Sequence, residues 1–337
     1  MLNFDPDRFT RIQTGALALA DDLGDALRRC LDDGAANLVL TGAGGVQILM
    51  QPAFQLLRTR STFPVHYEMG AELVRTDSVH LTDRSIVLLP SLSGTTAEAI
   101  EVVRFAKSKG ATVVTLTGHA DTPIADLADR NFTNFAEDDT SAEMFYLLSL
   151  VAALAILDHR DELEDHAGTI GELKRLPERL LAVKAQFEDR ARELASTYRN
   201  EPYLIVTGAG SVWPEAHYYG MCILEEMQWI RTRPVHASDF FHGTLELVEK
   251  DVSVLVLQGE DACRPLTERV VRFLPRVTDR MEVIDTAAFE LPELSTATRA
   301  LISPVLLATA LERLSAHLEQ VRDHPLTTRR YYKKLDY

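Results

Sequence analysis

The sequence has 337 residues, enough for two domains of ordinary size. Its apolar fraction is 46% and its charged fraction 25%, and both are normal for a globular protein. The net charge of −15 and the lack of a basic cluster before the extreme C-terminus argue against nucleic acid as a partner. An anionic substrate is compatible with this charge, because a local nest of backbone N–H groups can hold a phosphate in an acidic protein.

The chain carries no sign of a membrane or an oxidising compartment. No stretch reaches about 18 uninterrupted apolar residues, so no membrane-spanning helix is expected. The start, MLNFDPDRFTR, lacks the basic-then-apolar pattern of a signal peptide. The three cysteines, Cys30, Cys222 and Cys263, are scattered and indicate neither a disulfide framework nor a zinc site. We therefore expect a cytoplasmic protein without a metal.

The predicted elements begin with an amphipathic helix over residues 15–33. The run LVLTGAGGV, residues 38–46, is typical of a buried parallel strand that enters a Gly-rich turn. Residues 86–105 predict an apolar strand, a polar turn and a helix that ends in VVRF. Residues 141–157 are apolar almost all round, which predicts a helix buried between lobes or subunits, and residues 171–198 predict a connecting helix.

Two of these segments occur twice. LIVTGAGSV begins at residue 204, which is 166 positions after residue 38, where LVLTGAGGV begins. VLVLQGEDACRPLTERVVRF begins at residue 254, which is 168 positions after IVLLPSLSGTTAEAIEVVRF at residue 86. Strands alternate with helices in both halves, so the fold class is α/β, with two tandem doubly wound parallel-sheet lobes. The predicted parts are an N-terminal helical segment (1–33), a first lobe (34–160), a helical linker (161–198), a second lobe (199–320) and a C-terminal tail (321–337).

A cluster of hydroxyl groups follows the second strand of the first lobe. The turn reads Ser91-Leu92-Ser93-Gly94-Thr95-Thr96, after IVLLP and before a helical pattern. Hydroxyls, a flexible glycine and the free N–H groups of a new helix all suit a phosphate monoester. A plain N-cap is the alternative, but one hydroxyl would suffice for it and the turn has four.

The second lobe lacks this turn. At the offset of 168, Ser93 corresponds to Asp261 and Gly94 to Ala262, and Glu260 stands beside them. Carboxylates repel phosphate, so we expect one phosphate site per chain, in the first lobe. The two GAG turns are not dinucleotide fingerprints, because Gln47 and Trp213 stand where the third glycine belongs.

These features resemble the sugar isomerase (SIS) domain family, whose folds are flavodoxin-like. The most specific match is Ser91-x-Ser93-Gly94-x-Thr96, followed by Glu98, and Thr117 and TPIADLAD resemble the family's next strand end and turn. The resemblance implies that this turn binds the substrate's phosphate, together with the first Gly-rich turn at Gly42. Family members often carry a serine where this chain has Gly44, so we expect that contact either to be missing or to be replaced by a backbone N–H.

The second lobe carries another family feature. In two-lobed proteins that resemble the isomerase half of glucosamine-6-phosphate synthase, a helix glutamate precedes a His-Gly pair by sixteen residues, which matches Glu226 and His242 here. The resemblance implies that Glu226 moves a proton between adjacent sugar carbons and that His242 assists ring opening, often across a subunit boundary. From the residues alone, Glu225 and His236 are rivals. Glu225 and Glu226 point about 100° apart on a helix, so only one is expected to face a site.

The ending, HPLTTRRYYKKLDY, resembles that of the fructose-amino-acid-6-phosphate deglycases, which release glucose 6-phosphate and an amino acid from a phosphorylated Amadori compound. The resemblance implies a tail that folds over the site and carries a lysine, matched by Lys334 with Lys333 as the alternative. We expect Arg329 and Arg330 to bind the amino acid's carboxylate.

The predicted activity is therefore deglycation of a phosphorylated sugar-amine without a cofactor. A phosphosugar isomerase or amino-sugar-phosphate deaminase shares most of the steps, and a non-catalytic sugar-phosphate sensor needs the turn but not Glu226 or His242. A homodimer or larger homo-oligomer is expected from the apolar helix and the shared site.

Overall fold

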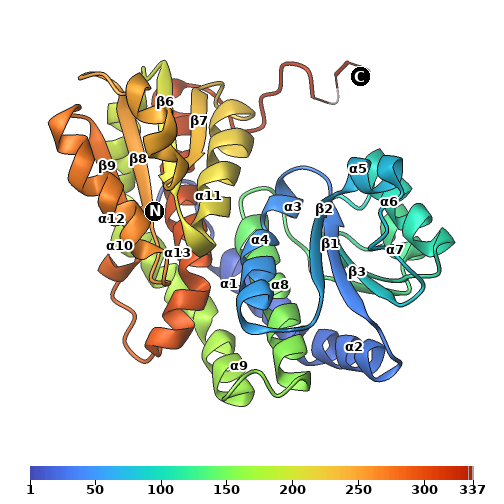
Figure 1. Ribbon diagram of the computed structural model, residues 1–337. Coiled ribbons are helices and arrows are strands. Elements are labelled where there is room, and N and C mark those ends of the chain that lie inside the picture. The colour runs from blue at the N-terminus through green and yellow to red at the C-terminus, as the bar shows by residue number, and fades with distance from the viewer. Residues whose placement is uncertain (333, 336–337) are drawn as a thin grey trace. The chain divides into compact units, whose positions relative to one another are not determined.

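The computed structural model describes residues 1–332, 334 and 335, and Figure 1 shows the chain as a ribbon. The chain divides into two compact units. The N-terminal unit comprises Pro6–Pro177, and the C-terminal unit comprises Met1–Asp5 together with the chain from Glu178 onward. Each unit holds one parallel sheet, so the predicted α/β architecture with two lobes is confirmed.

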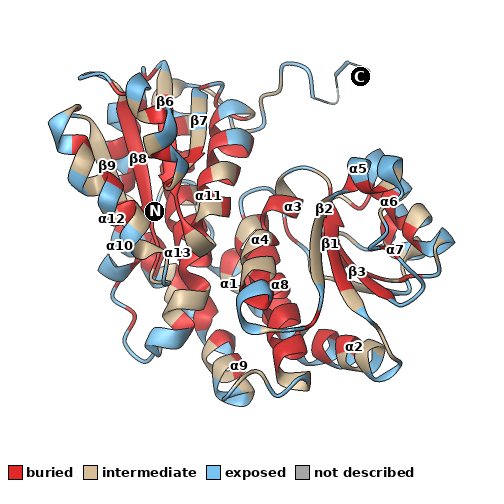
Figure 2. Cartoon of the chain, viewed as in Figure 1, coloured by how far each residue is buried: buried red, intermediate tan, exposed pale blue. Residues whose placement is uncertain are grey.

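The four strands of the second sheet repeat the order of the first four strands of the first sheet, which is the structural form of the sequence duplication. The sheet of the N-terminal unit has the order β2-β1-β3-β4-β5, and that of the C-terminal unit has the order β7-β6-β8-β9. The strands are β1 (Asn37–Gly42), β2 (Val65–Met69), β3 (Ser85–Ser91), β4 (Thr112–Thr117), β5 (Arg130–Thr133), β6 (Tyr203–Gly208), β7 (Arg231–His236), β8 (Ser253–Gln258) and β9 (Met281–Asp285). The central strands β3 and β8 are buried at every residue, as Figure 2 shows in red.

Helices surround each sheet. Those of the N-terminal unit are α1 (Pro6–Ala18), α2 (Ala20–Asp32), α3 (Gly45–Ile48), α4 (Gln51–Arg60), α5 (Gly70–Thr76), α6 (Ala97–Ser108), α7 (Pro123–Leu127), α8 (Ser141–His159) and α9 (His166–Lys174). Those that follow are α10 (Leu176–Tyr198), η1 (Gly210–Val212), α11 (Trp213–Tyr218), η2 (Tyr219–Glu225), η3 (Asp239–His242), η4 (Thr244–Leu247), α12 (Arg264–Phe273), η5 (Leu274–Arg276), η6 (Thr286–Ala288) and α13 (Thr296–Arg322).

Three predicted helices have different bounds. The single helix expected over 15–33 is two helices, because the Leu19 N–H donates to the Ala16 carbonyl in a tighter turn that separates α1 from α2. The connecting helix expected over 171–198 is likewise interrupted, between α9 and α10. The helix expected to end in VVRF continues to Ser108 in the N-terminal unit, while its copy α12 ends there as expected.

Two long helices, α8 and α13, form apolar centres of their units. Both meet the length and hydropathy of a membrane span, but 89% of the most apolar window of each is buried inside the protein, as in core helices of soluble proteins. Helix α8 packs against α1, α2 and α4 of its own unit. Burial among helices accounts for its lack of a polar face.

The first residues of the chain belong to the C-terminal unit. The Leu2 N–H donates to Glu188 Oε1 (2.7 Å), and the Leu2 carbonyl accepts from Arg313 Nη1 (2.8 Å). The buried cations Lys184 and Arg313 also lie over the Phe4 ring. The N-terminal segment therefore completes a buried charged cluster in the C-terminal unit, which nothing in the sequence pattern predicted.

Candidate active site

The turn over residues 91–96, called here the hydroxyl turn, lies at the carboxyl end of β3. Ser91 ends the strand, and its buried Oγ accepts from the Gly94 N–H (3.1 Å), which closes the turn. Ser93 Oγ accepts from both the N–H (3.3 Å) and the Oγ1 (3.1 Å) of Thr95. Ser91 thus has an internal role, while the half-buried Ser93 and the exposed Thr95 present their hydroxyls near the surface.

Only glycine fits the centre of this turn. Gly94 has φ +64°, and a Cβ there would lie 2.2 Å from Thr122 Oγ1. Thr122 is itself fixed, because its Oγ1 accepts from the Ala125 N–H at the start of α7. The Gly94 carbonyl accepts from the Ile124 N–H (3.2 Å). The segment around the start of α7 therefore fixes the position of the hydroxyl turn.

The helix that follows the turn has an open N-terminus. Thr96 occupies the N-cap of α6 with extended backbone (φ −63°, ψ 125°), but its side chain makes no capping hydrogen bond. The first N–H groups of a helix have no partner within the helix and carry partial positive charge. With Thr95 exposed beside them, this end of α6 can accept an anion from solvent.

The first Gly-rich turn lies beside the hydroxyl turn. Strands β1 and β3 are paired neighbours, and a Cβ on Gly42 at the end of β1 would lie 3.6 Å from Pro90 Cδ. Gly44 has φ +66° and is the N-cap of α3. The structure thus brings together the predicted phosphate-binding residues of both turns: Gly42, Gly44, Ser91, Ser93, Gly94, Thr95 and Thr96.

The corresponding nest in the C-terminal unit is filled by a carboxylate of the protein itself. Asp261 Oδ2 accepts from the Ser211 N–H (2.6 Å), and Asp261 Oδ1 accepts from the Cys263 N–H (2.7 Å). These donors belong to the second GAG turn and to the start of α12. Glu260 forms a bidentate pair with Arg299 (2.8 and 2.9 Å). The Asp261 carboxylate therefore occupies, in the C-terminal unit, the position that corresponds to the uncapped start of α6 in the N-terminal unit.

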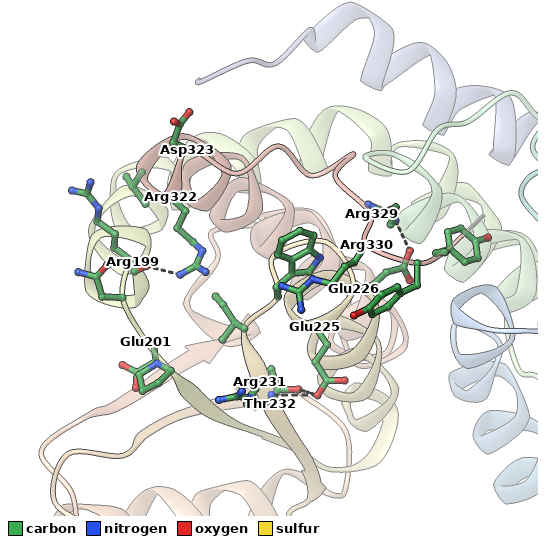
Figure 3. Close-up of a pocket in the computed structure, with 17 residues that line it drawn as sticks. Arg199, Glu201, Glu225, Glu226, Arg231, Thr232, Arg322, Asp323, Arg329 and Arg330 are labelled. Atoms are coloured by element: carbon green, nitrogen blue, oxygen red, sulfur yellow. Dashed lines mark hydrogen bonds and ion pairs between the residues drawn. The ribbon is translucent and has the colours of Figure 1, made fainter. Parts of the chain in front are cut away.

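Glu226 lines a pocket of about 1150 Å³ in the C-terminal unit (Figure 3). The pocket lies where β6 and β7 begin, beneath the residues that follow α13. Its charged lining residues are Arg199, Glu201, Glu225, Glu226, Arg231, Arg322, Asp323, Arg329 and Arg330. Glu226 Oε1 lies 2.8 Å from Arg329 Nε, and the Arg330 guanidinium lies over the Trp229 ring at 4.0 Å from its centroid.

The expectation that only one of Glu225 and Glu226 faces a site is wrong, since both line this pocket. They do not follow ordinary α-helical spacing, because Tyr219–Glu225 is a π-helix and Glu226 is its C-cap. Glu225 Oε1 accepts from the Oγ1 (2.7 Å) and the N–H (3.2 Å) of Thr232, which ties it to the start of β7. Glu226 instead turns toward the tail, as the dashed line in Figure 3 shows.

His242 lies at the other end of β7. Glu226 precedes this strand, whereas His242 ends η3 after it, is exposed, and is followed by Gly243 with φ +145°. The six residues of β7 span roughly 17 Å at the usual rise, and His242 is not among the described residues that line the pocket. The rival His236 is held by Ser238 Oγ (2.7 Å), and burial lowers its pKa.

The tail carries the last predicted site residues. Lys334 Nζ donates to the Arg329 carbonyl (2.6 Å), which places Lys334 on the same segment that contacts Glu226. Lys333 lies outside the described residues. The sequence reasoning missed Trp229, Arg231 and Arg322 as pocket residues. Trp229 has φ +54°, an uncommon conformation for a bulky side chain, and no sequence pattern marks it. Among the residues that the structure describes, no cluster of His, Cys, Asp and Glu suits a metal ion.

Comparisons with known proteins agree with this architecture. A SIS domain model matches residues 34–158. The fructoselysine 6-phosphate deglycase of Escherichia coli O157:H7 is 30% identical over 84% of this chain and 81% of its own. Fructosamine deglycase FrlB of Bacillus subtilis is 27% identical over 89% of this chain and 92% of its own.

Solved structures show the same fold. A provisionally named phosphosugar isomerase from Bacillus subtilis superposes with a TM-score of 0.87 at 25% identity, over 96% of this chain and 99% of its own. The C-terminal domain of glucosamine-fructose-6-phosphate aminotransferase from Francisella tularensis has a TM-score of 0.77 at 17% identity, over 95% and 94%. The chain belongs to the two-lobed SIS domain family and, within it, resembles the fructosamine and fructoselysine 6-phosphate deglycases.

Proposed function

We propose that this protein is a deglycase that cleaves a 6-phosphorylated fructosyl-amino acid to glucose 6-phosphate and the free amino acid. The observation that carries the proposal is the position of Glu226, a carboxylate in an arginine-lined pocket, in a chain that also presents an open hydroxyl turn. The names of the deglycase relatives support the same reaction class.

The hydroxyl turn binds the 6-phosphate. The Ser93, Thr95 and Thr96 hydroxyls and the first N–H groups of α6 supply donors, and Ser91 and Gly94 hold the turn's shape. Gly42 and Gly44 let the neighbouring backbone approach the sugar phosphate without side chains. A phosphate fixed at C6 orients the reacting carbons, which lowers the entropic part of the barrier.

Glu226 is the base of the proton transfer. It removes a proton from C1 of the open-chain ketoamine, and the C1–H electron pair forms a C1=C2 bond as the C2 carbonyl becomes a hydroxyl. Glu226 returns its proton to C2, and the amine N–H proton passes to solvent in exchange for the proton that solvent gave to the C2 oxygen, which leaves an imine between C1 and the amine nitrogen. Water adds to C1, the C1–N bond breaks, and the amine leaves with a proton. The net reaction consumes one water and leaves the glutamate as it began.

Lys334 and Arg330 assist at the same site. Lys334 stabilises the negative charge that develops on the C2 oxygen, which is the role of a positioned cation in such reactions. Arg330, stacked on Trp229 at 4.0 Å, binds the carboxylate of the amino acid. Both lie on the segment that Arg329 fixes to Glu226, so base and cations form one cluster.

His242 opens the sugar ring, and we infer that it serves the site of another copy of the chain. Within one chain, β7 separates His242 from Glu226. We therefore expect E226Q and H242N each to be inactive alone, and a mixture that is unfolded and refolded together to regain activity. A dimer of two such variants would hold one site with both wild-type residues. A mixture as inactive as its parents would contradict a shared site.

The test of the function is a panel of 6-phosphofructosyl amino acids, with glucose 6-phosphate followed by a coupled dehydrogenase. Release of glucose 6-phosphate together with free amino acid is the expected result. Conversion of fructose 6-phosphate to glucose 6-phosphate without turnover of the panel would instead assign a phosphosugar isomerase. Thermal stabilisation by fructose 6-phosphate with no turnover of any substrate would assign a sugar-phosphate sensor.

A further inference from the structure

The charge of the pocket around Glu226 points to the kind of amino acid that leaves. This inference rests on the proposed function, because it takes Glu226 as the base at C1. The amine nitrogen is bonded to C1, so the substituents of the amine must lie within a few bonds of the Glu226 carboxylate. The pocket that Glu226 lines is therefore the space that receives the amino acid.

Four guanidinium groups in this pocket have no carboxylate partner among the described residues: Arg199, Arg231, Arg322 and Arg330. Arg322 is held by backbone instead, donating to the carbonyls of Arg199 and Gln228, and Arg330 is held by the Trp229 ring. Arg231 is exposed at the first position of β7. These side chains are presented to the pocket of a protein whose net charge is −15.

The acidic residues of the pocket are mostly engaged. Glu226 is paired with Arg329. Glu201 is buried and paired with Arg280, and its carboxylate also accepts a hydrogen bond from Ser253 Oγ. Glu225 accepts two hydrogen bonds from Thr232. Only Glu225 and Asp323 are left without a cationic partner in the described structure, so the pocket has an excess of positive charge.

We propose that the substrate is the conjugate of an acidic amino acid, with Arg330 at its α-carboxylate and Arg231 at its side-chain carboxylate. A guanidinium offers paired N–H donors that match a carboxylate, and the stacked Arg330 is already oriented. An amine with a second ammonium group, as in a lysine conjugate, would meet like charge at Arg231 and Arg322. The charge of the amino acid's side chain thus decides which conjugate the pocket accepts.

The experiment compares 6-phosphofructosyl aspartate with 6-phosphofructosyl asparagine, which have nearly the same shape and differ in one charge. We expect kcat/KM for the aspartate conjugate to exceed that for the asparagine conjugate at least tenfold, and that for the lysine conjugate by more. R231Q should reduce the aspartate-to-asparagine ratio toward one, whereas R330Q should lower kcat/KM for both. The control R276Q removes an exposed arginine outside the pocket and should leave the ratio unchanged.

The outcomes separate this inference from the proposed function. Equal or better turnover of the asparagine or lysine conjugate would overturn the acidic preference while the deglycase activity stands. A preference for aspartate that R231Q does not change would overturn the role of Arg231. Silence toward every conjugate would instead count against the proposed function itself. Raising the salt concentration should shrink the aspartate preference, because exposed charges are screened.

Discussion

Arg329 Nε lies 2.8 Å from Glu226 Oε1, and this ion pair joins the segment after α13 to the end of the π-helix η2. The Arg329 side chain is largely covered, with 13% of its surface exposed, against 37% for Glu226. Arg329 also donates to the Leu326 carbonyl (2.6 Å), so its guanidinium is held from two sides. Glu226 therefore has a fixed cation at one oxygen, and part of its side chain is exposed where it lines the pocket.

Arg329→Gln should lower kcat/KM by about tenfold or more, since the carboxylate loses the partner that orients it and the tail loses its anchor. Because Lys334 donates a hydrogen bond to the Arg329 carbonyl, its position also depends on the tail, and we expect kcat to fall more than KM rises. Arg329→Lys keeps the charge and should retain part of the activity. Steady-state kinetics with a 6-phosphofructosyl amino acid that the wild type cleaves measure kcat and KM of both variants. A wild-type kcat in R329Q would contradict a positioning role.

The hydroxyl turn should control phosphate affinity. Ser93→Ala and Thr95→Ala each remove one hydroxyl donor, half-buried at Ser93 and exposed at Thr95, and we expect each to raise KM several-fold with little change in the melting temperature. Ser108→Ala, at the far end of the same helix α6, is the matched control and should leave KM unchanged. Binding of fructose 6-phosphate by calorimetry measures the same loss. Unaltered affinity in both variants would place the phosphate elsewhere.

Gly94→Ala should disrupt the turn itself. The positive φ costs about 1–2 kcal/mol for a residue with a Cβ, and the clash with Thr122 Oγ1 adds to it. We expect weakened phosphate binding and a lower melting temperature. Gly171→Ala is a suitable control, because a Cβ there meets no atom within 4 Å. A G94A protein with wild-type binding would show that the turn rearranges at little cost.

Asp261 should stabilise the C-terminal unit in place of a bound anion. Asp261→Ala leaves the N–H groups of Ser211 and Cys263 without their acceptor, which costs about 1–3 kcal/mol each if water does not reach them. Chemical denaturation should show the loss, and inorganic phosphate should restore part of it. Asp279→Ala, which removes an exposed carboxylate, is the control. Stability equal to wild type in D261A would contradict the role of Asp261 as a substitute anion.

The buried charged cluster at the N-terminus predicts a loss of stability in acid. Burial raises the pKa of Glu312, but the charges and hydrogen bonds of Lys184 and Arg313 outweigh it, so the net pKa lies below the ordinary value. A depressed pKa in the folded state contributes stability above the unfolded value, about 4.5, and the contribution disappears as pH falls through the folded value.

Phe4→Ala should lower the free energy of unfolding at pH 7, since Phe4 covers Lys184 and Arg313. Denaturant titrations at pH 7 and below pH 4.5 measure both effects. Val79→Ala, at an 85% exposed side chain, is the matched control. A wild-type stability that stays unchanged at pH values well below 4.5 would contradict the acid sensitivity of the cluster.

The duplicated strands and the hydroxyl turn could be predicted from the sequence because they depend on local patterns. Apolar runs that end in glycine or serine define β1, β3 and β6, and a run followed directly by a glycine defines β8. The positive φ of Gly94 is of the kind that glycine favours. The nest filled by Asp261 was also foreseeable as a lost phosphate site, although the sequence predicted repulsion and the structure shows an internal acceptor.

The rest depends on contacts between distant residues. The π-helical winding before Glu226 changes which side chains share a face, and no periodicity in the sequence signals it. The pairing of Arg329 with Glu226 and the stacking of Arg330 on Trp229 join segments about a hundred residues apart. The entry of Leu2 and Phe4 into the C-terminal unit spans most of the chain. Local propensity carries no information on such contacts.

The most direct measurement is the release of glucose 6-phosphate and free amino acid by the wild type, E226Q and E225Q, on the best conjugate of the panel. We predict equimolar products from the wild type, no turnover above background by E226Q, and substantial activity in E225Q, whose carboxylate bonds Thr232. Unchanged thermal stabilisation of E226Q by fructose 6-phosphate would show an intact phosphate site. Wild-type turnover by E226Q would contradict the assignment of Glu226 as the base.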